Sequence, residues 1–279
     1  MLPMMGALAA LYRRWIPALL ILGACSPTSS VNEAAPSGPM ATNVKLTDAE
    51  MKNDPLPAAR KLIDQRETPG ALDRAVALLE AQLPPKRQSP ELLVMLAEAH
   101  SRCLETLDVK KQADLAPHEQ HRTRGRFHAQ EALRLAPDHG AAQYWLGCLL
   151  LHAAEAERSY GRLKEALPHL QLAQKQAPAT DDGGPARMLG RVYQETPGGL
   201  LLGSKPEAIK WYKKSLEVAP DFMSTHLWLG ETYVASSQPA LARPELKRVV
   251  AIKPRGGHEK EEGGYRQKAE ELIKKLPAE

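Results

Sequence analysis

The chain has 279 residues, enough for one large domain or two ordinary ones. Hydrophobic residues make up 43% of it but aromatic residues only 5%, so strand-favouring residues are scarce and strong helix formers are abundant. This composition predicts an all-α protein. The net charge of +4, with no basic run interleaved with aromatic residues, argues against a nucleic-acid-binding surface.

Residues 1–24 have the pattern of a secretory signal peptide. Two arginines at 13–14 precede the apolar stretch 15–24, which is too short to cross a bilayer as a helix. The sequence LGAC that ends at Cys25 resembles the lipobox of bacterial lipoproteins, in which the cysteine is acylated and becomes the new N-terminus. The resemblance implies a lipid anchor on Cys25, and an uncleaved signal anchor is the alternative.

Residues 25–54 are rich in Ser, Pro, Ala and Thr and lack apolar periodicity, which predicts a disordered tether after the lipidated cysteine. Ser26, directly after Cys25, resembles the residue found in lipoproteins that are sent to the outer membrane. We therefore expect a protein of the bacterial cell envelope that is anchored by lipid, in the outer membrane, and faces the periplasm.

Residues 55–279 are predicted to form one helical repeat domain. Its first part contains four helical segments, at 56–67, 71–83, 90–106 and 118–136, which read as degenerate helical pairs. Proline follows Ser89, and this pattern places Ser89 as the N-cap of the third segment. The last segment, 262–276, has apolar residues at helical spacing among many charges and is predicted to cap the domain.

Three internal repeats lie between these parts. Each begins with a Leu-Gly pair on a first helix, and each second helix ends at a proline. The Leu-Gly pairs are Leu146-Gly147, Leu189-Gly190 and Leu229-Gly230, and the prolines are Pro178, Pro220 and Pro254. In the last repeat Tyr233, Ala242 and Leu246 complete a pattern that resembles the tetratricopeptide repeat (TPR) family with its spacing unbroken. The resemblance implies a solenoid of helical hairpins in which the small residues mark close helix crossings.

The other two repeats are lengthened between their Gly and Ala positions, by six residues in the repeat of Gly190 and by seven in that of Gly147. These insertions predict some helices longer than those of a regular TPR. The segment 181–222 is also similar to the T components of TRAP transporters, which are periplasmic TPR-like lipoproteins that accompany a solute-binding protein. This similarity covers roughly residues 90–254.

The TPR resemblance also implies a groove lined by the first helices. Residues placed at fixed offsets from each repeat glycine give the candidate partner-binding set Tyr144, Arg187, Arg191, Gln194 and Glu231. Arg187 and Arg191 are four residues apart, so their guanidinium groups can share one helix face and hold the carboxylate or phosphate of a small acidic ligand. The alternative is that the two arginines form ion pairs with Glu195 or Asp182.

Other reactive residue types give weaker signals. Cys103 and Cys148 fall in predicted helices, where they can be paired or can be free and buried. His118, His121 and His128 are expected on the surface of a basic helix, without enough further ligands for a metal. No nucleophile, zinc-helix or phosphate-loop motif is complete, so we expect no enzymatic activity and no cofactor.

The resemblances together imply a function in binding. The expected protein faces the periplasm and binds a protein partner, such as a TRAP-type solute-binding component, through its TPR-like groove. The alternative is a structural TPR adaptor in outer-membrane, pilus or secretion assembly. Self-association is left open.

Overall fold

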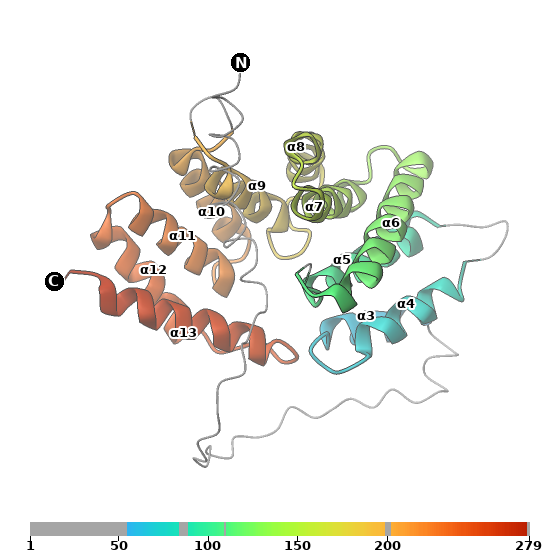
Figure 1. Cartoon of the computed structure of the whole chain (residues 1–279), viewed down its shortest axis with the longest axis horizontal. Helices are drawn as coiled ribbons and strands as arrows, with labels where there is room; N and C mark the ends of the chain where they lie inside the picture. The colour runs from blue at the N-terminus through green and yellow to red at the C-terminus, as the bar shows by residue number, and fades with distance from the viewer. Residues whose placement is uncertain (1–54, 84–88, 109, 199–201, 278–279) are drawn as a thin grey trace, which may run out of the picture.

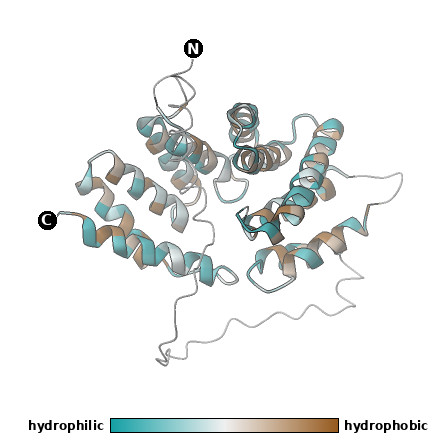
Figure 2. Cartoon of the chain, viewed as in Figure 1, coloured by the Kyte–Doolittle hydropathy of each residue, from teal (hydrophilic) through white to brown (hydrophobic). Residues whose placement is uncertain are grey.

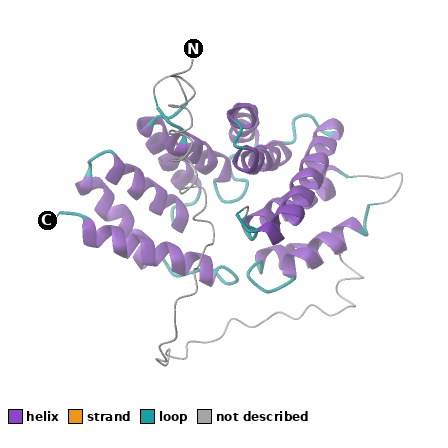
Figure 3. Ribbon diagram, in the orientation of Figure 1, coloured by secondary structure: helices purple, strands orange, loops and turns teal. Residues whose placement is uncertain are grey.

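The computed structural model describes residues 55–83, 89–108, 110–198 and 202–277. These residues contain α-helices and no strand (Figure 3). The helices in chain order are α3 (Pro55–Asp64), α4 (Ala71–Glu80), α5 (Pro90–Glu105), α6 (Gln112–Leu135), α7 (Gly140–Glu157), α8 (Tyr160–Gln176), α9 (Gly184–Glu195), α10 (Lys205–Val218), α11 (Met223–Ala235), α12 (Pro239–Ala251) and α13 (Glu259–Lys275).

Successive helices pair into hairpins, α3 with α4, α5 with α6, and so on to α11 with α12. The unpaired helix α13 packs on α12 and α11, as expected of a capping helix. Figure 1 shows the hairpins following one another around a curve, so that the start of α13 returns to the turn after α3. The predicted all-α, TPR-like solenoid is therefore confirmed.

The three Leu-Gly pairs lie where two helices of a hairpin cross. A Cβ added at Gly147, Gly190 or Gly230 would lie within 2.7 Å of the side chain of Leu170, Tyr212 or Leu246, respectively. Real Cβ contacts are not this short, so a larger residue would push the helices apart. The apolar faces of the hairpins meet neighbouring helices, and polar residues cover the outside (Figure 2).

The two insertions have different outcomes. The seven extra residues lengthen helices, since α7 has 18 residues and α8 has 17, against 13 each in α11 and α12. The prediction is wrong for the six-residue insertion, because α9 and α10 have only 12 and 14 residues. The insertion falls instead between the end of α9 at Glu195 and the start of α10 at Lys205. There the backbone approaches so closely that a Cβ on Gly203 would overlap the carbonyl oxygen of Thr196.

The observed helix starts agree only in part with those predicted from the sequence. Ser89 accepts a hydrogen bond from the N–H of Leu92 (3.1 Å), as predicted. Helix α6 begins at Gln112, six residues before the expected start, with Pro117 inside it. Proline weakens helix interiors, but near the start of a helix it removes only one intrahelical hydrogen bond, so α6 can begin before Pro117.

The signal peptide, the lipidated Cys25 and the tether up to residue 54 lie outside the described residues. Within the described part of the chain, no helix combines the length and the apolar character that a membrane span requires.

Candidate binding surface

The loop between α8 and α9 holds a carboxylate that connects three helices. Asp181 accepts hydrogen bonds from Tyr144 of α7 (2.6 Å) and Arg187 of α9 (2.7 Å), and also pairs with Arg102 of α5. Burial alone would raise the pKa of Asp181, but the two guanidinium groups and the Tyr144 hydroxyl lower it to about 2. Asp181 is therefore ionised and joins the N-terminal hairpins to the regular repeats.

Both arginines of the predicted pair lie against aromatic rings. The Cζ atom of Arg187 lies 3.9 Å from the ring centroid of Phe222, and that of Arg191 lies 4.9 Å from the ring of Trp228. Such cation-π contacts are stronger when the cation is shielded from water. Arg187 is only 4% exposed and Arg191 only 8%, so neither guanidinium projects freely into a groove.

The remaining predicted groove residues surround Arg191. Glu195 lies 2.7 Å from the Arg191 guanidinium, and Glu231 lies 3.9 Å from it. Gln194 accepts a hydrogen bond from Tyr212 (2.5 Å). The structure thus brings Arg191, Gln194 and Glu231 together. The other two predicted residues, Tyr144 and Arg187, contact Asp181 instead.

These ion pairs favour the alternative interpretation of the two arginines. Arg191 pairs with Glu195 as that alternative states, whereas Arg187 pairs with the carboxylate of Asp181 and meets Asp182 only through its carbonyl oxygen (2.9 Å). An acidic ligand at either guanidinium would have to compete with a carboxylate of the chain itself.

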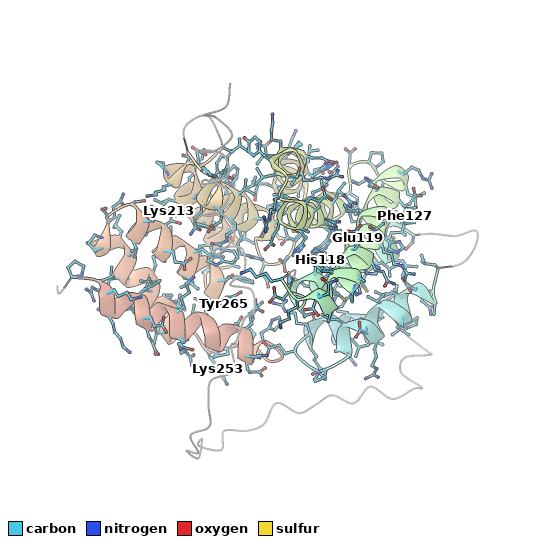
Figure 4. The ribbon with its side chains drawn as sticks, viewed as in Figure 1. His118, Glu119, Phe127, Lys213, Lys253 and Tyr265 are labelled. Carbon is cyan, nitrogen blue, oxygen red and sulfur yellow. The ribbon has the colours of Figure 1, made fainter. Side chains whose placement is uncertain are left out.

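The two ends of the described domain meet through charged groups. The carboxylate of Glu67 accepts hydrogen bonds from the N–H groups of Lys260 (2.9 Å) and Glu261 (2.7 Å), which belong to the first turn of α13. Arg66 pairs with Glu261 at 2.5 Å. The hydroxyl of Tyr265 also donates to Glu261 (2.5 Å) from the inner side of α13 (Figure 4). The start of α13 is therefore fastened to the turn after α3.

A cavity of about 360 Å³ lies where these parts meet. Its lining includes four arginines, Arg60, Arg66, Arg102 and Arg255, together with four carboxylates and His258. Most of these charges are paired, for example Arg60 with Glu98 through two hydrogen bonds of 2.6 and 2.7 Å. The side chains of Arg60 and Arg255 nevertheless remain 40% and 42% exposed, so they are the cationic groups of the cavity that water and a partner can reach.

The prediction that the histidines lie on the surface is wrong for His118 and His128, whereas the alternative in which the two cysteines are free and buried is confirmed. His118 and His128 are 5% and 6% exposed, so the expectation that they lie on the surface is wrong. Their side of α6 is covered by neighbouring helices, since α6 packs against both α5 and α7. Cys103 and Cys148 are free and buried, which confirms the unpaired alternative. Burial raises the pKa of each thiol to about 12.

No family model and no curated protein matches the chain, but solved structures do. One is TTC0263, a thermophilic TPR protein in Thermus thermophilus, with a TM-score of 0.54 and 20% identity over 75% of this chain and 96% of that one. Structures of MamA include an RS-1 double mutant (TM-score 0.45, 21% identity, 71% of this chain and 94% of that one) and MamA of MSR-1 (0.40, 19%, 78% and 96%). The likeness to TTC0263 establishes a TPR-like helical fold, and at these identities the comparisons concern the fold alone.

Sequence reasoning missed the residues that connect the repeats. Asp181 lies in a loop that the repeat pattern does not describe. Arg60 and Arg102 come from helices with no recognisable repeat motif, and Arg66 comes from the turn after α3. The unusual run of two aspartates and two glycines at 181–184 was the only local signal. It gives a tight turn in which both aspartates have positive φ (51°).

Proposed function

We propose that this chain is a lipid-anchored binding protein of the bacterial cell envelope that faces the periplasm and has no enzymatic activity. It holds a protein partner on the inner side of the ring that the helices form where the start of α13 meets the turn after α3. Three features support the proposal. They are the TPR-like fold, the lipobox that ends at Cys25, and the tether of residues 25–54, which would let the domain reach a partner away from the bilayer.

The observation that carries the proposal is the central cavity with its two half-exposed arginines. A recess of 360 Å³ is large enough for a side chain of a partner or a small acidic ligand. Arg60 and Arg255 offer guanidinium groups that can form paired hydrogen bonds with a carboxylate. All four guanidinium groups are paired with carboxylates of the chain, but Arg60 and Arg255 are 40% and 42% exposed whereas Arg187 and Arg191 are only 4% and 8% exposed, so the acidic group would bind here rather than between Arg187 and Arg191.

For the partner, we propose a solute-binding component of a TRAP-type uptake system. The similarity of residues 181–222 to T components supports this choice. The same segment supplies Asp181 and Asp182 to the lining of the cavity, and its Phe222 contacts the guanidinium of Arg255. A T component of this kind would present the cavity to the solute-binding protein while the lipid holds it at the membrane.

The test is affinity capture from the native cell envelope, using the full chain with Cys25 intact, followed by mass spectrometry. We expect one dominant partner, a solute-binding component. The double variant Arg60→Ala/Arg255→Ala should capture at least about tenfold less of it, because both accessible cations of the cavity are lost. Lys213→Ala/Lys253→Ala is the matched control, since both lysines are exposed and lie away from the cavity (Figure 4).

Equal capture by the cavity variant and the lysine control would contradict the proposed surface. Recovery of pilus, secretion or outer-membrane assembly proteins in place of a solute-binding component would identify the chain as a structural adaptor. The anchor is tested separately with Cys25→Ser, which should move the protein from the membrane fraction to the soluble fraction and remove the acyl mass from its N-terminal peptide.

A further inference from the structure

Three of the first helices bring metal-binding side chains together away from the cavity. Glu80 is the last residue of α4, His100 lies on α5 and His128 lies on α6. One ligand atom from each of the three residues lies within 4.8 Å of the other two. The carboxylate oxygen of Glu80 is 4.0 Å from Nε2 of His100. In a tetrahedral site, ligand atoms that bind Zn²⁺ at 2.0–2.1 Å lie about 3.3 Å apart, so small side-chain movements would complete the set.

One ring nitrogen of each of these two histidines is buried without a hydrogen-bond partner in the part of the chain that the structure describes. His100 is 1% exposed and His128 is 6% exposed. Nε2 of His100 and Nδ1 of His128 are both shielded from solvent and have no hydrogen-bond partner among the described residues. A buried polar atom without a partner costs free energy, so it requires an explanation. A bound cation would satisfy the lone pair that His100 directs towards Glu80.

The tautomer of His100 supports the same assignment. Its Nδ1 lies 2.9 Å from Nδ1 of His121, so one of the two rings donates a hydrogen bond to the other. When His100 donates through Nδ1, its Nε2 carries a free lone pair that faces Glu80. His121 then orients the ligand from behind, as hydrogen-bond acceptors commonly do for metal-binding histidines.

A second set of possible ligands lies beside the first and competes with it. Asp73, Cys103 and His121 also have ligand atoms within 4.8 Å of one another. That set needs Nε2 of His121 as a ligand, so His121 would have to donate through Nδ1 and the proton of His100 would move to Nε2. Two neutral rings cannot serve both sets at once. The first set is favoured because, within the described residues, Nε2 of His100 and Nδ1 of His128 are buried without a hydrogen-bond partner, whereas neither Asp73 nor His121 has such an atom.

We propose that Glu80, His100 and His128 form a Zn²⁺ site that fastens α4 and α5 to α6. Two imidazoles and one carboxylate are typical zinc ligands, with the fourth position left to water. The Glu80 side chain is 32% exposed, so an ion can enter from the solvent side. Arg124 now pairs with Glu80 at 2.7 Å, and because its side chain is 48% exposed it can turn to water when a cation replaces it. The site has a structural role, since it joins the first hairpin to the second.

The test uses the full mature chain without an affinity tag, stripped of metal and titrated with ZnCl₂ in a calorimeter. We expect one Zn²⁺ per chain and a rise in Tm of about 5 °C or more at saturating Zn²⁺. Glu80→Gln should weaken binding at least about tenfold and keep the fold, because the side chain is partly exposed. Arg124→Gln should tighten binding, because it removes a competing cation.

Two controls separate the site from general binding to histidines and from the competing set. His118→Gln alters a histidine of the same helix outside the set, and Cys103→Ser removes a ligand of the competing set, so both should leave the Zn²⁺ affinity unchanged. Co²⁺ bound in place of Zn²⁺ should give the visible bands of a tetrahedral site without a thiolate charge-transfer band. No saturable binding, equal binding by wild type and Glu80→Gln, or loss of binding in Cys103→Ser would each overturn the proposal.

Discussion

Helices α7–α12 and helices α3–α6 belong to one curved stack, but different contacts hold them. In the regular repeats, a glycine of each first helix faces an apolar or aromatic side chain of its second helix. In the α5/α6 hairpin the glycine is Gly125 of the second helix, and a Cβ there would lie 2.7 Å from the side chain of Leu149 of α7 and 2.9 Å from Cβ of His100. Polar rings also meet between these two helices, since His100 of α5 contacts the rings of His121 and His128 of α6.

This difference has a cost that is visible in the structure. Several of the buried polar atoms without a partner lie in α5 and α6, on His100, Ser101, Arg126 and His128. An apolar crossing needs no partner groups, whereas a polar one must be satisfied by neighbours or by a ligand. The regular part therefore supplies the framework. In the irregular part a bound ligand would satisfy buried polar atoms that lack a hydrogen-bond partner among the described residues.

The largest expected effect is on the carboxylate that joins the two regions. Asp181→Asn tolerates the positive φ but removes the charge that Arg102 and Arg187 share. We expect the free energy of unfolding to fall by about 3–5 kcal/mol, as when one partner of a buried pair is removed. Denaturant unfolding measures this. Asp182→Asn is the control, because the Asp182 side chain is 66% exposed, and an equal loss in both variants would show that the turn matters rather than the charge.

The same carboxylate predicts a dependence on pH. Its pKa is lowered in the folded state from 3.8 to about 2, so its ionised form stabilises the fold above pH 4. That stabilisation, about 2 kcal/mol, is lost as the pH falls from about 4 to about 2. The difference in unfolding free energy between wild type and Asp181→Asn should therefore shrink by about this amount between pH 5 and pH 2. A constant difference would contradict the assignment of charge to Asp181.

Two glycine substitutions should have opposite signs. Gly190→Ala places a methyl group 2.6 Å from the ring of Tyr212 and should destabilise the chain by about 1–3 kcal/mol. Gly264→Ala, on an exposed part of α13 with no atom within 4 Å, should stabilise it by about 0.5–1 kcal/mol through helix propensity. Thermal unfolding of both variants tests this. If both substitutions raised the Tm, the helix crossing at Gly190 would have room for a methyl group, contrary to the close contact with Tyr212.

The smallest expected effect is at the closure of the ring. Glu67→Gln should weaken the cap on the first turn of α13 and cost about 0.5–1 kcal/mol. Hydrogen exchange should become faster in residues 259–262 and remain unchanged in α7 and α8. Glu270→Gln, on the exposed face of α13, is the control. Unchanged exchange in Glu67→Gln would mean that the two ends are held together by other contacts.

Much of the regular part could be predicted from the sequence. The Leu-Gly pairs, the later Ala positions and the closing prolines predicted which helices cross, because only small residues fit a close crossing. The candidate site was predicted less well. The sequence named Glu195 as an alternative partner of the two arginines, and the structure pairs it with Arg191, but the sequence pattern gave no sign that Asp181 pairs with Arg187. A repeat pattern describes contacts within a hairpin, and these carboxylates lie outside that pattern.

The sequence by itself determined the helical class and the repeat register, because these depend on local spacing and residue type. Only the tertiary structure decided that α13 returns to the turn after α3, that four arginines line one cavity, and that Glu80, His100 and His128 meet. The physical reason is that curvature accumulates over the whole stack. The angle of each hairpin is set by side-chain packing, and residues nearly 200 positions apart come together only through the sum of those angles.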